Sequence, residues 1–109
     1  ILQLHMLNLN LSISSFYYLI KTLYRKNFRK FNALKEIDEK MLQYINFENG
    51  YYIEMGAHDG VHNSNTFYFE KYKKWKGILI EPSEYFEFLI KNRSNKNLEP
   101  KFLTVVGSV

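Results

Sequence analysis

The residues whose types and spacing best suit ligand binding are two acids and a glycine-containing turn that lies between them in the sequence. Glu54 and Glu81 each stand at the end of a short apolar run. Gly56 and Gly60 bound the turn after the first run, where a residue without Cβ lets the backbone bend and lets a ligand come close. A strand-end acid about 20 residues beyond such a turn suits the hydroxyl pair of a ribose, since a carboxylate accepts two hydrogen bonds at once. The spacing therefore predicts a corner that binds a nucleoside.

The turn also discriminates between nucleoside cofactors. The dinucleotide fingerprint has a middle glycine that lets the backbone approach a pyrophosphate. Ala57 and His58 occupy the equivalent part of this turn, so that glycine is missing. With the acid at Glu54, the corner fits a cofactor that has a cationic, amino-acid-like arm and no phosphate. We therefore expect S-adenosylmethionine, and an NAD-dependent oxidoreductase is the disfavoured class.

The elements around this corner alternate along the chain. β-prone runs cover 51–55, 75–80 and 102–106, and runs with helical spacing cover 65–72 and 84–93. Strands that alternate with helices favour a parallel sheet with right-handed crossovers. The predicted fold class is α/β: an incomplete, Rossmann-like parallel sheet in the order β-α-β-α-β, preceded by N-terminal helices.

The N-terminal half has a different character. Leu7–Ile13 alternates between apolar and Asn or Ser residues, whereas helical spacing begins at Phe16 and predicts one amphipathic helix to about Phe31 and a second over 33–45. The predicted organisation is a poorly defined leader over 1–15, a helical segment over 16–48 and a partial cofactor-binding domain over 51–109. The chain starts with Ile1 and ends in a strand-like run, so we expect it to be part of a longer protein.

Composition narrows the function classes. The 109 residues suffice for one small domain, and the absence of cysteine excludes disulfides and thiolate metal sites. The net charge of +4 comes largely from basic runs at 21–30 and 71–76, which we interpret as solvated surfaces, so no nucleic-acid partner is expected.

No signal peptide is predicted, and we expect a cytoplasmic protein. The basic residues from Lys21 leave open a membrane-proximal anchor, although membrane contact by residues 1–20 is not favoured.

Residues 51–93 resemble the FkbM family of methyltransferases. The resemblance rests on four motifs in order, namely Ile53–Gly60, Ser64–Thr66, Trp75–Pro82 and Asn92–Arg93, although the family usually has Asn where this chain has His58. It implies a Rossmann-like fold and methyl transfer to a hydroxyl of a sugar or natural product, so the partner would be a small-molecule or glycan acceptor. It also implies that the turn Gly56–Gly60 cradles the methionine part of the cofactor and that Glu81 holds the ribose.

The predicted cofactor-binding residues are Glu54, Gly56, Ala57, His58, Asp59, Gly60, Asn65, Thr66, Glu81 and Pro82. No catalytic base is assigned, no metal site is predicted, and the oligomeric state is open.

Structural alternatives accompany these assignments. The glycines also suit a simple tight turn, an interpretation that the neighbouring acids Glu54 and Glu81 disfavour. Asp59 suits an Asx-turn, and Ser64–Thr66 suits the start of a helix. Glu81 is also placed to favour the dipole of the helix that follows it. The alternative function is a truncated or non-catalytic Rossmann-like nucleotide-binding module.

Overall fold

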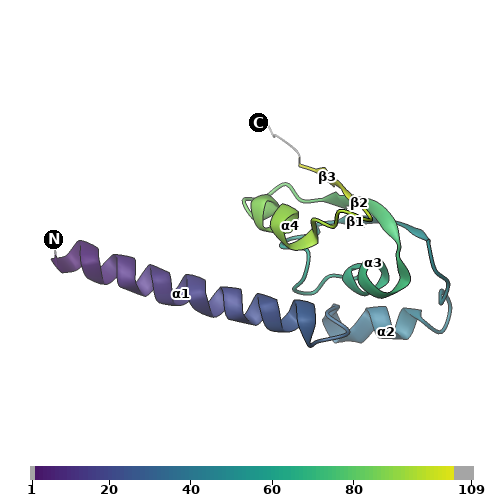
Figure 1. Cartoon of the computed structure of the whole chain (residues 1–109), viewed down its shortest axis with the longest axis horizontal. Helices are drawn as coiled ribbons and strands as arrows, with labels where there is room; N and C mark the ends of the chain where they lie inside the picture. The colour runs from purple at the N-terminus through teal and green to yellow at the C-terminus, as the bar shows by residue number, and fades with distance from the viewer. Residues whose placement is uncertain (1, 105–109) are drawn as a thin grey trace.

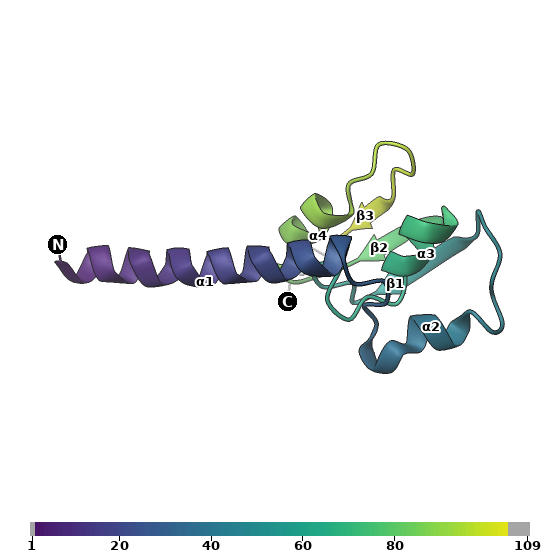
Figure 2. The same ribbon diagram turned by 60° about the horizontal axis from the view of Figure 1, so that its bottom comes forward.

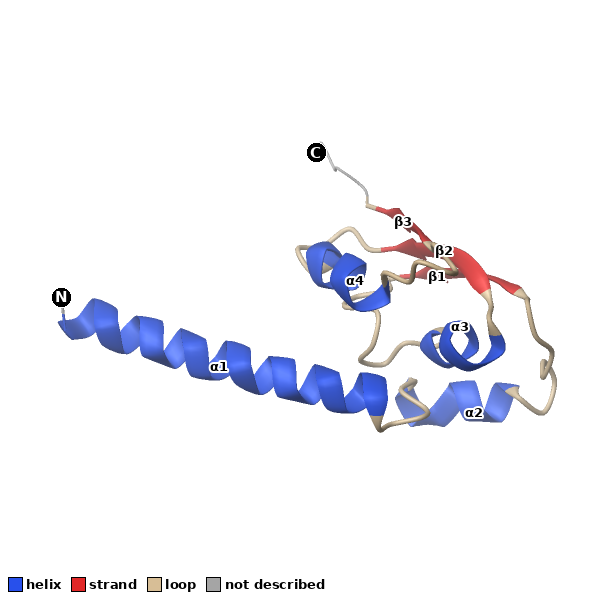
Figure 3. Ribbon diagram, viewed as in Figure 1, coloured by secondary structure: helices blue, strands red, loops and turns tan. Residues whose placement is uncertain are grey.

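A three-stranded parallel sheet forms the centre of the protein. The computed structural model describes residues 2–104, with side chains from residue 13 onward. The strands β1 (Tyr51–Met55), β2 (Lys76–Ile80) and β3 (Lys101–Leu103) lie in the order β1-β2-β3 (Figure 3). Met55 pairs with Ile80, so β1 and β2 end side by side. The predicted α/β class and the β-α-β-α-β order are confirmed.

Two helices cover one face of this sheet. The helices α3 (Phe67–Lys73) and α4 (Phe86–Arg93) follow β1 and β2 and lie on the same side (Figure 1), as expected when successive right-handed crossovers move along a sheet in one direction. Tyr52 and Glu54 point to this covered side and are buried, whereas the three other residues of β1 are exposed. The strand therefore carries its acid toward the helices.

The core between the sheet and the helices is rich in aromatic rings. Its buried members are Tyr52, Ala57, Tyr68, Phe69, Trp75, Leu79 and Leu89. The indole N–H of Trp75 donates to the carbonyl oxygen of Phe47 at 2.7 Å, which satisfies the polar atom of a buried ring. Gly77 has no room for a side chain, since a Cβ there would lie 2.2 Å from the carbonyl oxygen of Tyr52.

The N-terminal region is more regular than its sequence suggests. The helix α1 (Leu2–Asn27) includes most of the residues for which a poorly defined leader was predicted. The second predicted helix is broken: η1 (Leu34–Glu36) precedes the short α2 (Ile37–Met41), because Lys35 and Glu36 have positive φ angles of 53° and 57°. No helix within residues 2–104 is both long enough and apolar enough to cross a membrane.

The other elements differ from prediction only at their ends. The helix predicted from residue 65 starts at Phe67, and the one predicted from residue 84 starts at Phe86. The third strand ends at Leu103, and the last residues predicted for it lie outside the described part of the chain.

Candidate functional site

The turn after β1 has the backbone geometry that the glycines predict. Gly56 and Gly60 have φ angles of 69° and 83°, in the left-handed region that disfavours residues with a Cβ. His58 also has a positive φ, 55°, which is uncommon for a non-glycine residue. The N–H of Ala57 donates to the carbonyl oxygen of Ile80 at 2.9 Å, so the turn is fixed to the end of β2.

Gly56 and Gly60 differ in their surroundings. A Cβ built on Gly56 meets no atom within 4 Å, so its backbone faces open space. A Cβ on Gly60 would lie 2.5 Å from Cγ of Arg93 and 2.7 Å from Cδ1 of Leu89. The first glycine is therefore accessible to a ligand, whereas the second permits close packing of the turn against α4.

Glu81 lies where β2 ends and joins the glycine turn to the start of α4. One carboxylate oxygen accepts the N–H of His58 at 2.6 Å, and the other accepts the N–H of Ser83 at 2.9 Å. Burial acts to raise the pKa of Glu81, but the hydrogen bonds from Ser83 and His58 outweigh it and hold the pKa below its ordinary value. Glu81 is thus a carboxylate at neutral pH, in contact with the predicted turn.

Glu54 is directed to a different part of the same loop. Its carboxylate accepts the N–H groups of Asn65 and Thr66 at 2.8 and 3.0 Å and the hydroxyl of Ser64 at 3.1 Å. Burial raises its pKa, although the charge of Arg93 and these donors act in the opposite direction. Glu54 therefore orders the segment that leads into α3, and its hydrogen bonds in the structure are all internal.

Asp59 has the Asx-turn that its sequence position allows. One carboxylate oxygen accepts the N–H groups of Val61 and His62, each at 2.9 Å. The other accepts the hydroxyl of Tyr18 at 2.7 Å and lies 2.6 Å from Nδ1 of His62. The side chain is fully buried. Asp59 thus secures the turn and ties it to α1.

The remaining predicted residues divide into accessible and internal positions. Asn65 and Pro82 are exposed, at the entry to α3 and just after Glu81 respectively. Ala57 is buried in the core, and the hydroxyl of Thr66 donates to Glu54 at 3.2 Å. The predicted residues therefore lie along the loop after β1 and at the end of β2, but only some of them face solvent.

A buried guanidinium beneath this corner was not given a role by the sequence. Arg93 donates to the carboxylate of Glu70 at 2.6 Å and to the carbonyl oxygen of Gly60 at 3.0 Å. It also donates to the hydroxyls of Tyr52 at 3.0 Å and Ser64 at 3.2 Å. Asn92–Arg93 is one of the four motifs, and that position was the only signal available in the sequence.

An aromatic pair and a groove adjoin the turn. The ring of His58 stacks on Tyr85 with centroids 3.8 Å apart. Tyr85 also lines a groove of about 670 Å³ between α1 and α4, together with Tyr18 and Phe88. Because Tyr18 binds Asp59, the groove and the turn share their supporting residues.

No protein-family model matches this chain, and neither the curated proteins nor the solved structures contain a match to it.

The candidate site is therefore the edge of the sheet where β1 and β2 end. The structure brings Glu81, Gly56 and His58 together at this edge. Glu54, the last residue but one of β1, is engaged with the far end of the same loop, so the two acids hold different segments. Sequence spacing predicted the position of both acids and did not distinguish these two roles.

Proposed function

We propose that this chain is the cofactor-binding part of an S-adenosylmethionine-dependent methyltransferase with a Rossmann-like fold, acting on a hydroxyl of a small molecule or glycan in the cytoplasm. The observation that carries the proposal is the hydrogen bond between the carboxylate of Glu81 and the N–H of His58. It joins a strand-end acid to a glycine turn at the carboxyl edge of a parallel sheet, which is the place where open α/β sheets bind nucleosides. The resemblance of residues 51–93 to the FkbM family supports the same assignment.

The residues present fit the cofactor. Glu81 is 6% exposed, and each of its carboxylate oxygens accepts one N–H and has a second lone pair with which it can accept a ribose hydroxyl. The open space at Gly56 suits the methionine part of the cofactor, since no Cβ blocks the backbone there. Glu54 then serves the site indirectly, because it orders Ser64–Thr66 beside the turn.

The chemistry that the cofactor supplies is a methyl group activated by its bond to a sulfonium. The contribution of this chain is to bind and orient, which is a large part of catalysis when the reacting group is already activated. Glu81, as a carboxylate, fixes the sugar, and the turn Gly56–Gly60 fixes the amino-acid arm. A base for the acceptor hydroxyl is not assigned.

Calorimetric titration of the chain with S-adenosylmethionine and, separately, with NAD tests the proposal. We expect S-adenosylmethionine to bind and Glu81→Gln to weaken its affinity by about tenfold or more, because a charged acceptor is replaced by a neutral one. Glu84→Gln, an exposed acid three residues away, is the matched control and leaves the affinity unchanged. Binding of NAD alone, or equal affinity in Glu81→Gln, would overturn the proposal.

One observation favours a second function, a nucleotide-binding module without catalysis. Glu54 and Asp59 make internal hydrogen bonds in the structure, so both acids stabilise the loop after β1 whether or not a ligand is bound. Absence of methyl transfer by the chain in the presence of the cofactor, with retained affinity for adenosine, would favour this function.

A further inference from the structure

The helix α1 is attached to the domain by one side of its C-terminal half. Thr22 is buried against the domain, and Tyr18 contacts Asp59 by a hydrogen bond and Phe88 by an edge-to-face ring contact at 5.4 Å. The rest of the helix runs away from the sheet (Figure 2). Among the side chains of α1 that the structure describes, from residue 13 onward, those opposite Tyr18 and Thr22 are exposed, and we call this the free side.

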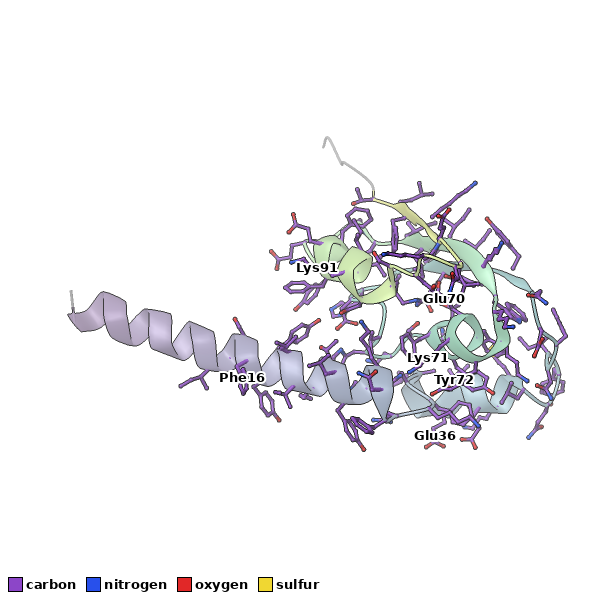
Figure 4. All side chains as sticks on the ribbon, in the orientation of Figure 1. Phe16, Glu36, Glu70, Lys71, Tyr72 and Lys91 are labelled. Atoms are coloured by element: carbon purple, nitrogen blue, oxygen red, sulfur yellow. The ribbon has the colours of Figure 1, made fainter. Side chains whose placement is uncertain are left out.

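The free side is apolar. Its side chains are between 44% and 65% exposed, and they form a stripe about 120° wide at 3.6 residues per turn. The stripe consists of Ile13, Phe16, Tyr17, Ile20, Leu23 and Tyr24. Phe16 lies on the part of α1 that extends beyond the sheet (Figure 4). A soluble domain seldom exposes a continuous apolar surface of this kind unless the surface binds something.

The segment that contains α1 carries charge of one sign. Residues 1–35 contain six Lys or Arg and no Asp or Glu, whereas the remainder of the chain has a net charge of −2. Lys21, Arg29 and Lys30 are exposed, and Lys21 lies over the ring of Tyr17 at 5.6 Å, beside the stripe. Arg29 and Lys30 follow the end of α1, where Nζ of Lys30 lies 5.6 Å from the ring of Phe31. The region thus combines an apolar strip, tyrosine and phenylalanine rings, and basic residues from a segment of the sequence that contains no acid.

We propose that α1 binds an anionic lipid surface, lying along it with the apolar stripe in the boundary between head groups and acyl chains. Lys21, Arg29 and Lys30 then contact the anionic head groups, as in interfacial amphipathic helices. The docking of Tyr18 and Thr22 on the domain turns the stripe outward and keeps the helix in the plane of that surface. A second copy of the chain fits this surface less well, because it would bring two positive segments together.

The sequence left membrane contact by residues 1–20 open but did not favour it. No apolar run there is long enough to span a membrane, and the alternation of apolar residues with Asn or Ser over Leu7–Ile13 accompanied the prediction of a poorly defined leader. The helix instead places Ile13, Phe16 and Ile20 on one side. The proposal is independent of the proposed methyltransferase function.

Co-sedimentation of the whole chain with vesicles of phosphatidylcholine, with and without phosphatidylglycerol, tests it. We expect binding to the vesicles that contain phosphatidylglycerol and at least about a tenfold loss in the variant Phe16→Ser/Ile20→Ser/Leu23→Ser. The control Tyr44→Ser/Ile53→Ser removes exposed apolar side chains outside α1 and leaves binding unchanged. Lys21→Gln/Arg29→Gln/Lys30→Gln is expected to remove the preference for phosphatidylglycerol.

A gain of signal provides a second measurement that does not depend on the loss variants. In Phe16→Trp, the new indole is expected to shift its emission to shorter wavelength when vesicles with phosphatidylglycerol are added, whereas Trp75 is already buried. An unshifted emission spectrum would overturn the proposal, and so would equal vesicle binding by the serine variant and wild type. It would also be overturned if the wild-type chain formed a dimer that did not bind vesicles and if the serine substitutions dissociated that dimer.

Discussion

The Nε atom of Arg93 donates to the carboxylate of Glu70 at 2.6 Å, and both side chains are buried. Glu70 lies on α3 on the side that faces the sheet (Figure 4), and Arg93 is the last residue of α4. The same guanidinium reaches the carbonyl oxygen of Gly60 and the hydroxyl of Tyr52. One ion pair thus joins both helices, β1 and the glycine turn, so the position of the candidate site depends on it.

Replacement of Arg93 by methionine is expected to lower the free energy of unfolding by about 3–5 kcal/mol, because it leaves the carboxylate of Glu70 buried without its partner. Urea unfolding followed by far-UV circular dichroism measures the loss. Lys91→Met, an exposed position on the same helix, is the matched control and should change stability by no more than about 0.5 kcal/mol.

The double variant Glu70→Leu/Arg93→Met separates the charge from the packing. It is expected to be more stable than Arg93→Met alone, since an apolar residue replaces the uncompensated carboxylate. A double variant as unstable as the single one would show that the volume of Arg93, rather than its charge, stabilises this region.

Substitution of alanine for each of the two glycines of the turn is expected to lower the free energy of unfolding by different amounts. Gly60→Ala combines a positive φ with a Cβ 2.5 Å from Arg93 and 2.7 Å from Leu89, and should cost about 2–4 kcal/mol. Gly56→Ala meets no atom within 4 Å and should cost only the backbone strain, about 1–2 kcal/mol. Paired urea midpoints measure the difference, and equal costs at the two positions would contradict the packing argument.

The sequence predicted the sheet better than the contacts that support it. Alternation and glycine boundaries are local signals, and they were sufficient for β1, β2 and their parallel order. The hydrogen bond from Tyr18 to Asp59 spans 41 residues and has no local signal. A strand-end acid such as Glu54 has one sequence signature whether it binds a ligand or orders a loop, so only coordinates separate the two roles.

The pH dependence of stability is expected to depend on Asp59. Burial acts to raise its pKa, but donors from Val61, Tyr18 and His62 outweigh burial and hold the pKa below its ordinary value. A depressed pKa in the folded state stabilises the protein above the unfolded-state pKa, and the stabilisation is lost as the pH falls through the folded-state pKa. The stability difference between wild type and Asp59→Asn should therefore shrink between about pH 5 and pH 2.

Urea unfolding at a series of pH values measures this difference. Glu84→Gln, an exposed acid, provides the control and should show a difference from wild type that changes little with pH. A difference for Asp59→Asn that stays constant down to about pH 2 would contradict the assignment of the depressed pKa.

Tyr18→Phe tests the attachment of α1 to the turn with the smallest available change. It removes the hydroxyl that donates to Asp59 at 2.7 Å and keeps the ring that stacks on His62 at 5.7 Å between centroids. Because the lost hydrogen bond has a charged, fully buried acceptor, the variant should lose about 1.5–3 kcal/mol at neutral pH. The loss should diminish in acid as Asp59 takes up a proton. Tyr17→Phe, on the exposed side of the same helix, is the control, and equal stability of Tyr18→Phe and wild type in urea would remove this contact from the account of how α1 is held.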